Sequence, residues 1–309
     1  MNPYWNADFF QTIALLLKRF VLLLSGQLPL EALVEDDIAL IALLTIGISC
    51  VFSGAFLVVK RMTLLINSLS HTILLGIVCA ALLLMSGTAG LIVAAMLTSF
   101  LTIASTNLLV KVFRVQQEAA VGFMFTTLFA LGVLFSTLFF RNTHLGVEAI
   151  FGNLDAVMVS DLPPLFAVLG LNLVWMFLVY ARLFVLTFDP IFSQTVGLKG
   201  TLLQMVNHFV LALTIVAGFQ SVGVVIIMSF FCLPVLIARQ FGASLKKIFL
   251  FGSLVSAFVS LISVAISRDI LTYFQTPVST GAVASIGLFL FYVGVGLTFN
   301  KKQFNLSSQ

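Results

Sequence analysis

Nine long apolar segments follow one another along this chain, and only short loops separate them. A helix needs about 20 mainly apolar residues to cross the hydrocarbon core of a bilayer, and most of these segments reach that length. They lie at about 38–59, 64–86, 88–110, 119–140, 163–186, 203–219, 222–239, 247–266 and 280–299. Charged residues make up 8% of the chain, whereas a soluble domain is roughly 25% charged. The pattern predicts an all-α, polytopic membrane helix bundle with about nine transmembrane helices.

Composition divides the chain into three parts. Residues 1–36 precede the first clear span, and their apolar run is broken by Lys18 and Arg19. We therefore expect a helix at the membrane interface there, rather than a further span or a signal peptide. Residues 37–302 contain all nine spans and no polar stretch long enough for a soluble domain, which predicts one transmembrane domain. Residues 303–309 form a polar C-terminal tail.

Basic residues mark the ends of the spans. If Lys60-Arg61 is cytoplasmic, alternation of the spans also places Lys111, the 187–202 loop and Lys246-Lys247 inside, as the positive-inside rule requires. The formal charge of +4 could indicate a nucleic-acid partner, but the basic residues are not gathered in a patch with aromatic ones. We predict membrane lipid as the surroundings and no nucleic-acid partner.

Several common chemistries are missing from the sequence. Cys50, Cys79 and Cys232 lie far apart within apolar runs, so neither a disulfide framework nor a thiolate metal site is indicated. There is no Gly-rich phosphate loop ending in Gly-Lys-Ser/Thr, and no nucleophile with a supporting His/Asp pair. Carboxylates within the spans are nearly absent, which argues against a proton-coupled carrier. The chain is predicted not to be an enzyme and to hold no cofactor.

The most polar stretch within a span is NSLSHTILLG, residues 67–76. Asn67 and His71 are four residues apart, so a helix places both side chains on the same face. Imidazole is a good ligand for divalent first-row metals and an amide oxygen is a weaker one. The alternative is that both side chains hydrogen-bond neighbouring helices, as polar residues in membrane bundles often do. Residue chemistry leaves these two interpretations open.

Two further histidines are weaker candidates for metal binding. His144 falls in a predicted outer loop, where a solvated histidine is the usual case. His208 follows Asn207 near the start of a span, where a packing role is the commoner explanation. No other histidine is present, so the single chain does not encode a tetrahedral His/Cys site of the structural zinc kind.

The loop at 187–202 contains the signals of a short capped helix. Asp189 is a favoured N-cap residue, Pro190 suits the first helical position, and Gly197 suits the end of a helix. A short helix between two spans on the predicted cytoplasmic side is a suitable docking point for a partner protein.

Six motifs in order resemble the permease subunits of bacterial ABC importers for manganese, zinc and iron, the ABC-3 family. They are GAFLVVKRMTLLINSLSHTILLG at 54–76, EAAVGFMFTTLFALGVL at 118–134, IFGNLDAV at 150–157, TFDPIFSQTVGL at 187–198, QSVGVVIIMSFFCLPVLIAR at 220–239 and TPVSTGA at 276–282. The resemblance covers roughly residues 38–300. It implies a multi-pass permease of the bacterial inner membrane that moves a divalent metal cation.

The resemblance also implies partners and site residues. Two permease subunits would form the pathway, cytoplasmic ATP-binding subunits would drive it, and an extracytoplasmic metal-binding protein would deliver the cargo. His71 corresponds to a pathway histidine of the family, with Asn67 and Ser70 beside it. The segment with Asp189, Pro190 and Gly197 corresponds to the helix that couples the permease to the ATPase.

This sequence departs from the family at two positions of interest. The family has an acidic residue where this chain has Asn67, so a second, non-identical permease subunit that keeps the acid is one possible arrangement. Asp155 occupies a usually apolar position. Two rival functions remain: a permease for a metal chelate such as a siderophore, haem or cobalamin, and a secondary transporter independent of ATP.

Overall fold

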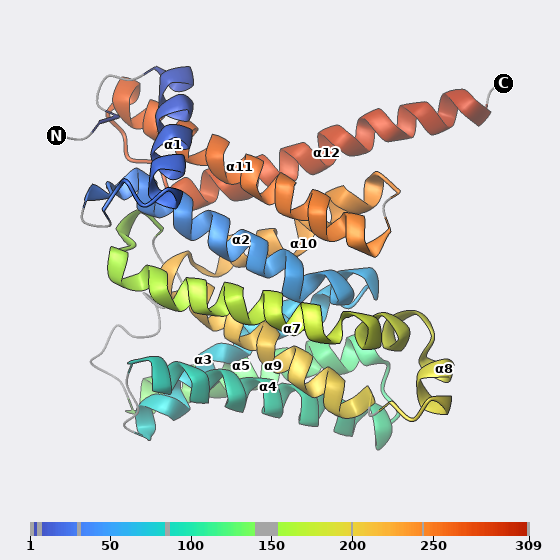
Figure 1. The fold of residues 1–309 in the computed structure, drawn as a ribbon. Helices are drawn as coiled ribbons and strands as arrows, with labels where there is room; N and C mark the ends of the chain where they lie inside the picture. The colour runs from blue at the N-terminus through green and yellow to red at the C-terminus, as the bar shows by residue number, and fades with distance from the viewer. Residues whose placement is uncertain are drawn as a thin grey trace.

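The computed structural model consists of helices and their connections throughout the residues that it describes (Figure 1). Those residues are 3–4, 8–29, 32–83, 87–139, 154–198, 200–242 and 244–307. The α-helices are α1 Phe9–Leu24, α2 Glu35–Val59, α3 Thr63–Leu82, α4 Gly87–Lys111, α5 Gln117–Phe139, α7 Leu162–Phe188, α8 Pro190–Thr195, α9 Gly200–Ser221, α10 Val224–Gln240, α11 Leu245–Phe274 and α12 Thr280–Ser307. Two short 3-10 turns, η2 Leu154–Ala156 and η3 Val159–Asp161, precede α7.

The helices confirm the predicted membrane bundle. Within the described ranges, eight helices are long and apolar enough to cross a membrane, and the shorter apolar helix Ile226–Gln240 lies in α10. Each of the nine predicted segments therefore corresponds to a helix. Two helices end well beyond their predicted limits: α11 continues to Phe274 and α12 to Ser307. Helix α12 thus extends into the 303–309 segment that composition marks as a polar tail.

Helix α2 lies at the centre of the bundle. It contacts α10 and α11 on one side and α7 and α9 on the other. Figure 1 shows α11 and α12 above α2, and α3, α4, α5 and α9 below it. The hydroxyl groups of Thr45, Ser49 and Ser53 each donate to the carbonyl four residues earlier, at 2.7 Å. These bonds allow a helix with several polar side chains to be almost fully buried.

Helix α1 is fastened to the bundle by a buried carboxylate. Asp37, at the start of α2, is 5% exposed and accepts hydrogen bonds from the Tyr4 hydroxyl and, at 2.8 Å, from Arg19 Nε. The hydrogen bond to Asp37 raises the pKa of Arg19, and burial raises that of Tyr4. Arg19, which interrupts the N-terminal apolar run, is therefore an anchor for α1. The interfacial position of this helix stays a prediction.

Charged side chains also join helix ends on the side of the bundle where α1 lies. Arg268 of α11 is 3.6 Å from Asp36 of α2, and this pairing lets α11 continue past the charged residues at which the predicted span stopped. Asp155, the residue that departs from the family pattern, accepts a hydrogen bond at 3.2 Å from the backbone nitrogen of Thr280. A carboxylate at the N-terminus of α12 interacts favourably with the helix dipole and so stabilises the helix. Asp155 thus has a structural role in this chain.

Candidate functional site

Helix α3 carries the NSLSHTILLG stretch and packs closely between α4 and α5. A Cβ built on Gly76 would lie 2.4 Å from the carbonyl oxygen of Ala94 in α4. A Cβ built on Gly132 of α5 would lie 2.9 Å from the backbone nitrogen of Leu75. Such contacts exist only because glycine lets two helix backbones approach closely. They hold α3 in a fixed position, and with it the polar side chains that it presents.

Asn67 and His71 lie one turn apart on α3, and both are partly buried. The His71 ring meets two aromatic rings of α5, with centroids 5.1 Å from Phe125 and 5.8 Å from Phe129. Among the described residues, neither the Asn67 amide nor the His71 imidazole has a hydrogen-bond partner. The described structure therefore gives no support to the interpretation that these two groups only join helices within the chain.

The hydroxyl groups on α3 face other neighbours. Ser70 is fully buried, and its Oγ donates to the carbonyl of Ile66 at 3.0 Å and lies 3.4 Å from Met228 Sδ of α10. Thr72 Oγ1 is 3.1 Å from Thr102 Oγ1 of α4. The structure keeps Asn67 and His71 on one face and turns Ser70 toward another helix, so Ser70 is not beside the imidazole.

This arrangement offers one nitrogen and one amide oxygen to a cation. Within the described part of the chain, no group of three His, Cys, Asp or Glu side chains is placed to hold a metal ion. A site with an imidazole and an amide is weak by itself, and a transported cation needs a site that it can leave. Further ligands would have to come from outside this set, for example from a second subunit.

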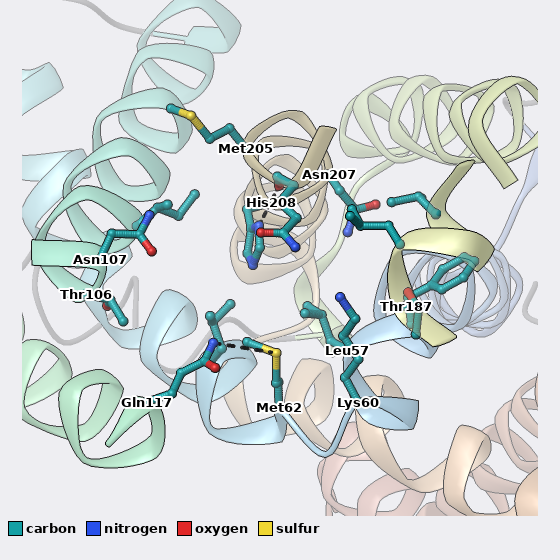
Figure 2. Close-up of a pocket in the computed structure, with 16 residues that line it drawn as sticks. Leu57, Lys60, Met62, Thr106, Asn107, Gln117, Thr187, Met205, Asn207 and His208 are labelled. Carbon is teal, nitrogen blue, oxygen red and sulfur yellow. Dashed lines mark hydrogen bonds between the residues drawn. The ribbon is translucent and has the colours of Figure 1, made fainter. Parts of the chain in front are cut away.

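His208 lies in a different place, beside a cavity of about 480 Å³ (Figure 2). The cavity opens among the ends of α2, α3, α4, α5, α7 and α9, and neither Asn67 nor His71 lines it. His208 is 8% exposed, and its Nδ1 is 2.5 Å from the carbonyl oxygen of Gln204. A carbonyl can only accept, so Nδ1 carries the proton, and in the neutral ring Nε2 then has a free lone pair. The sequence drew attention to His208 but gave no sign of the cavity or of Lys60 and Thr106 in its wall.

Helix α8 confirms the predicted capped helix between two spans. Asp189 is its N-cap and accepts a hydrogen bond at 2.9 Å from the Phe192 backbone nitrogen, Pro190 is its first residue, and Gly197 follows it with φ +71°. Only glycine adopts such a φ without strain. Ile191 and Phe192 are exposed on this short helix, which gives it an apolar surface. Figure 1 shows α8 at the opposite end of the bundle from α1.

His144 lies outside the described residues, so its predicted position in an outer loop stays a prediction. The Phe125 and Phe129 rings beside His71 were not expected from the sequence. Phenylalanine is abundant in this chain, with 32 residues, so two of them four apart carry no signal of their own.

Comparison with known proteins identifies relatives over most of the chain. A "probable metal transport system membrane protein" of Chlamydia muridarum is 34% identical over 298 residues, which cover 95% of this chain and 93% of that protein. The "manganese transport system membrane protein MntD" of Bacillus subtilis is 31% identical over 258 residues, which cover 79% of this chain and 85% of that protein.

A solved structure shares the fold. The structure of PsaBC from Streptococcus pneumoniae in complex with Fab superposes with a TM-score of 0.72 at 22% identity, covering 86% of this chain and 92% of that chain.

A family model described as "ABC 3 transport family" matches residues 37–298, a range that holds nearly all of the transmembrane bundle. This multi-pass membrane protein therefore belongs to the ABC 3 transport family.

Proposed function

We propose that this chain is the membrane-spanning permease subunit of an ATP-driven importer that moves a divalent metal cation, Mn, Zn or Fe, across a bacterial inner membrane. The observation that carries the proposal is the family match over residues 37–298. The relative from Bacillus subtilis, named for manganese transport, supports a metal ion as the cargo. One relative, from Yersinia pestis, is named for chelated iron transport, whereas relatives named for manganese and zinc transport favour the free cation as the cargo.

The partners follow from what the chain lacks and what it exposes. No phosphate-binding loop is present in the sequence, so ATP hydrolysis belongs to separate cytoplasmic subunits. Helix α8 is proposed as the coupling helix, because it is rigidly capped by Asp189 and Gly197 and exposes Ile191 and Phe192. An extracytoplasmic metal-binding protein would deliver the cargo at the other end of the bundle.

The proposed pathway runs past Asn67 and His71. Their side chains share one face of a helix that is fixed by close packing, and they have no hydrogen-bond partner among the described residues. An imidazole and an amide bind a divalent cation weakly enough for it to move on. Ser70 is proposed to support the helix rather than to bind metal, because its hydroxyl is committed to Ile66 and faces α10.

The absence of a carboxylate at position 67 bears on the second subunit. Within the described residues, no His, Cys, Asp or Glu cluster is placed to add a negative charge to a divalent cation at His71. We propose that a non-identical permease subunit supplies the acid. Purification of the native complex tests this: two unlike permeases are expected, and a complex with two copies of this chain and full transport would contradict it.

The function itself is tested by reconstitution. The permease, its ATP-binding subunits and the metal-binding protein are placed in vesicles, and uptake of Mn, Zn and Fe is measured with metal analysis of the vesicle contents. ATP-dependent, vanadate-sensitive uptake of the free ion is expected. Uptake of a metal chelate in preference to the free ion would favour a chelate permease, and uptake without ATP would favour a secondary transporter.

A further inference from the structure

The cavity beside His208 has an unusual balance of charge for a chain that moves cations. Its lining residues include polar side chains from α4, α5, α7 and α9, and Lys60 at the end of α2. Lys60 is the one charged residue among the described residues that line the cavity, and no carboxylate lines it. The positions of Lys60, Asn107, Gln117 and His208 around the open space can be followed in Figure 2.

Two buried polar atoms in the cavity wall lack hydrogen-bond partners among the described residues. They are His208 Nε2 and Thr106 Oγ1, and the two residues are 8% and 5% exposed. In α9, by contrast, Thr214 and Ser221 donate to the carbonyl four residues earlier, at 2.9 and 2.7 Å. A buried polar atom without a hydrogen-bond partner destabilises the folded state. Two of them in one polar cavity indicate that a ligand or solvent is their partner.

Lys60 is also without a counter-charge in the described structure. It is partly buried, and burial lowers its pKa because water no longer fully solvates the ammonium. No described carboxylate lies within salt-bridge distance of it. An anion in the cavity would stabilise this ammonium, whereas a metal cation would be repelled by it.

Side-chain amides add hydrogen-bond donors to this positive charge. The oxygen of Asn207 accepts a hydrogen bond from Trp175 Nε1 at 3.2 Å, so its NH₂ group remains as the donor. Asn107, Gln117 and Gln204 line the same space. The lone pair of His208 Nε2 can accept a hydrogen bond from a hydroxyl group of the ligand.

We infer that this cavity binds a phosphate group that carries or adjoins a hydroxyl, with Lys60 as the cationic partner and His208 Nε2 as the acceptor. Two sources share this chemistry. One is inorganic phosphate, which has a P–OH group near neutral pH. The other is the headgroup of an anionic phospholipid such as phosphatidylglycerol, because basic pockets between helices on the cytoplasmic side hold such headgroups. The cavity lies at the helix ends that also carry α8, so its ligand would sit beside the proposed coupling helix.

The test measures the melting temperature of the full chain in a neutral detergent. Three conditions are compared at equal ionic strength: inorganic phosphate, added phosphatidylglycerol, and chloride with phosphatidylcholine. We expect phosphate, phosphatidylglycerol or both to raise the melting temperature by about 2 °C or more over the third condition. A response to phosphate alone identifies a soluble ligand, and a response to phosphatidylglycerol alone identifies a lipid headgroup.

Three variants connect the response to the cavity. Lys60→Gln should abolish the rise in melting temperature, while Lys60→Arg, which keeps the charge and reports on folding, should retain it. Lys111→Gln is the matched control, because Lys111 is an exposed lysine at the end of α4 that does not line the cavity. The proposal is overturned if neither ligand stabilises the chain, or if the rise persists unchanged in Lys60→Gln. It is also overturned if Mn²⁺ stabilises the chain and His208→Gln removes that effect, since the cavity would then be a cation site.

None of these melting-temperature measurements depends on transport. A failure of the anion-site proposal is therefore distinct from a failure of the importer proposal.

Discussion

Two histidines of this chain lie in helices of the same bundle and have opposite surroundings. His71 is near the middle of α3, partly exposed, next to two phenylalanine rings and one turn from an amide. His208 is buried in α9, and its Nδ1 lies against a carbonyl of its own helix. Lys60, which has no carboxylate partner among the described residues, lines the same cavity. Imidazole is the same ligand in both places, so the neighbouring charge decides what each can bind. We therefore expect a cation at His71 and an anion in the cavity of His208.

Removing each imidazole in turn should have different effects on metal uptake. His71→Ala should lower metal uptake by about tenfold or more while leaving the complex assembled, because it removes the nitrogen ligand of the proposed pathway. His208→Ala serves as the paired variant and should keep most of the uptake. Uptake into vesicles and size-exclusion chromatography give the two readouts. Normal uptake by His71→Ala would exclude a pathway role for this residue.

A second substitution leaves both histidines intact and disrupts the proposed coupling between the permease and the ATP-binding subunits. Asp189→Ala deletes the N-cap of α8, which costs about 1 kcal/mol in helices of this kind and should loosen the proposed docking surface. We expect transport-stimulated ATP hydrolysis by the complex to be lost, although the proposed metal and phosphate sites are unchanged. Asp189→Asn, which can still cap the helix, should restore most of it. Unchanged coupling in Asp189→Ala would place the ATPase contact elsewhere.

The position of α3 can be tested through its closest contact. Gly76→Ala places a methyl group where the Ala94 carbonyl now lies, so it should destabilise the bundle by about 1–3 kcal/mol and shift His71 relative to α5. Gly122→Ala is the matched control, because a Cβ there meets nothing within 4 Å. Thermal unfolding in detergent measures both. Equal melting temperatures for the two variants would show that α3 is not fixed by this contact.

The smallest expected effect comes from restoring the family's charge beside His71. Asn67→Asp should strengthen metal binding severalfold, because a carboxylate adds a negative charge and a better oxygen ligand. Asn67→Gln keeps the neutral amide and should change binding little. Isothermal titration of Mn²⁺ into the purified chain provides the measurement. If Asp and Gln at this position give equal affinities, Asn67 does not face the metal.

The helices could be predicted from the sequence because membrane spans depend on local composition. The capping of α8 is a local signal too, since Asp189 and Gly197 act within a few residues of their own position. The length of α11 could not be predicted in this way, because Arg268 is tolerated through an ion pair with Asp36, far away in sequence. The cavity at His208 escaped prediction for the same reason, as its wall draws on six helices.

The surroundings of Asn67 and His71 could be predicted only in part from the sequence. Helical spacing placed them on one face, but the spacing could not show that Ser70 turns to α10 or that Phe125 and Phe129 flank the imidazole. Those facts depend on how α3 rotates between its neighbours. The rotation is fixed by glycine contacts that a single sequence does not reveal.

The contacts of α1 determine when this helix can dock during synthesis of the chain. One of its anchors, Asp37, follows within a few tens of residues, but another is the Tyr273 hydroxyl, which donates to Asp8 Oδ1 at 3.0 Å across 265 positions of sequence. The N-terminal helix is made first, yet it can dock fully only after α11 has been inserted, because contacts between distant residues form late. A docked α1 would thus mark a chain in which α11 is in place, while a chain truncated before α11 would lose the contact between Asp8 and Tyr273.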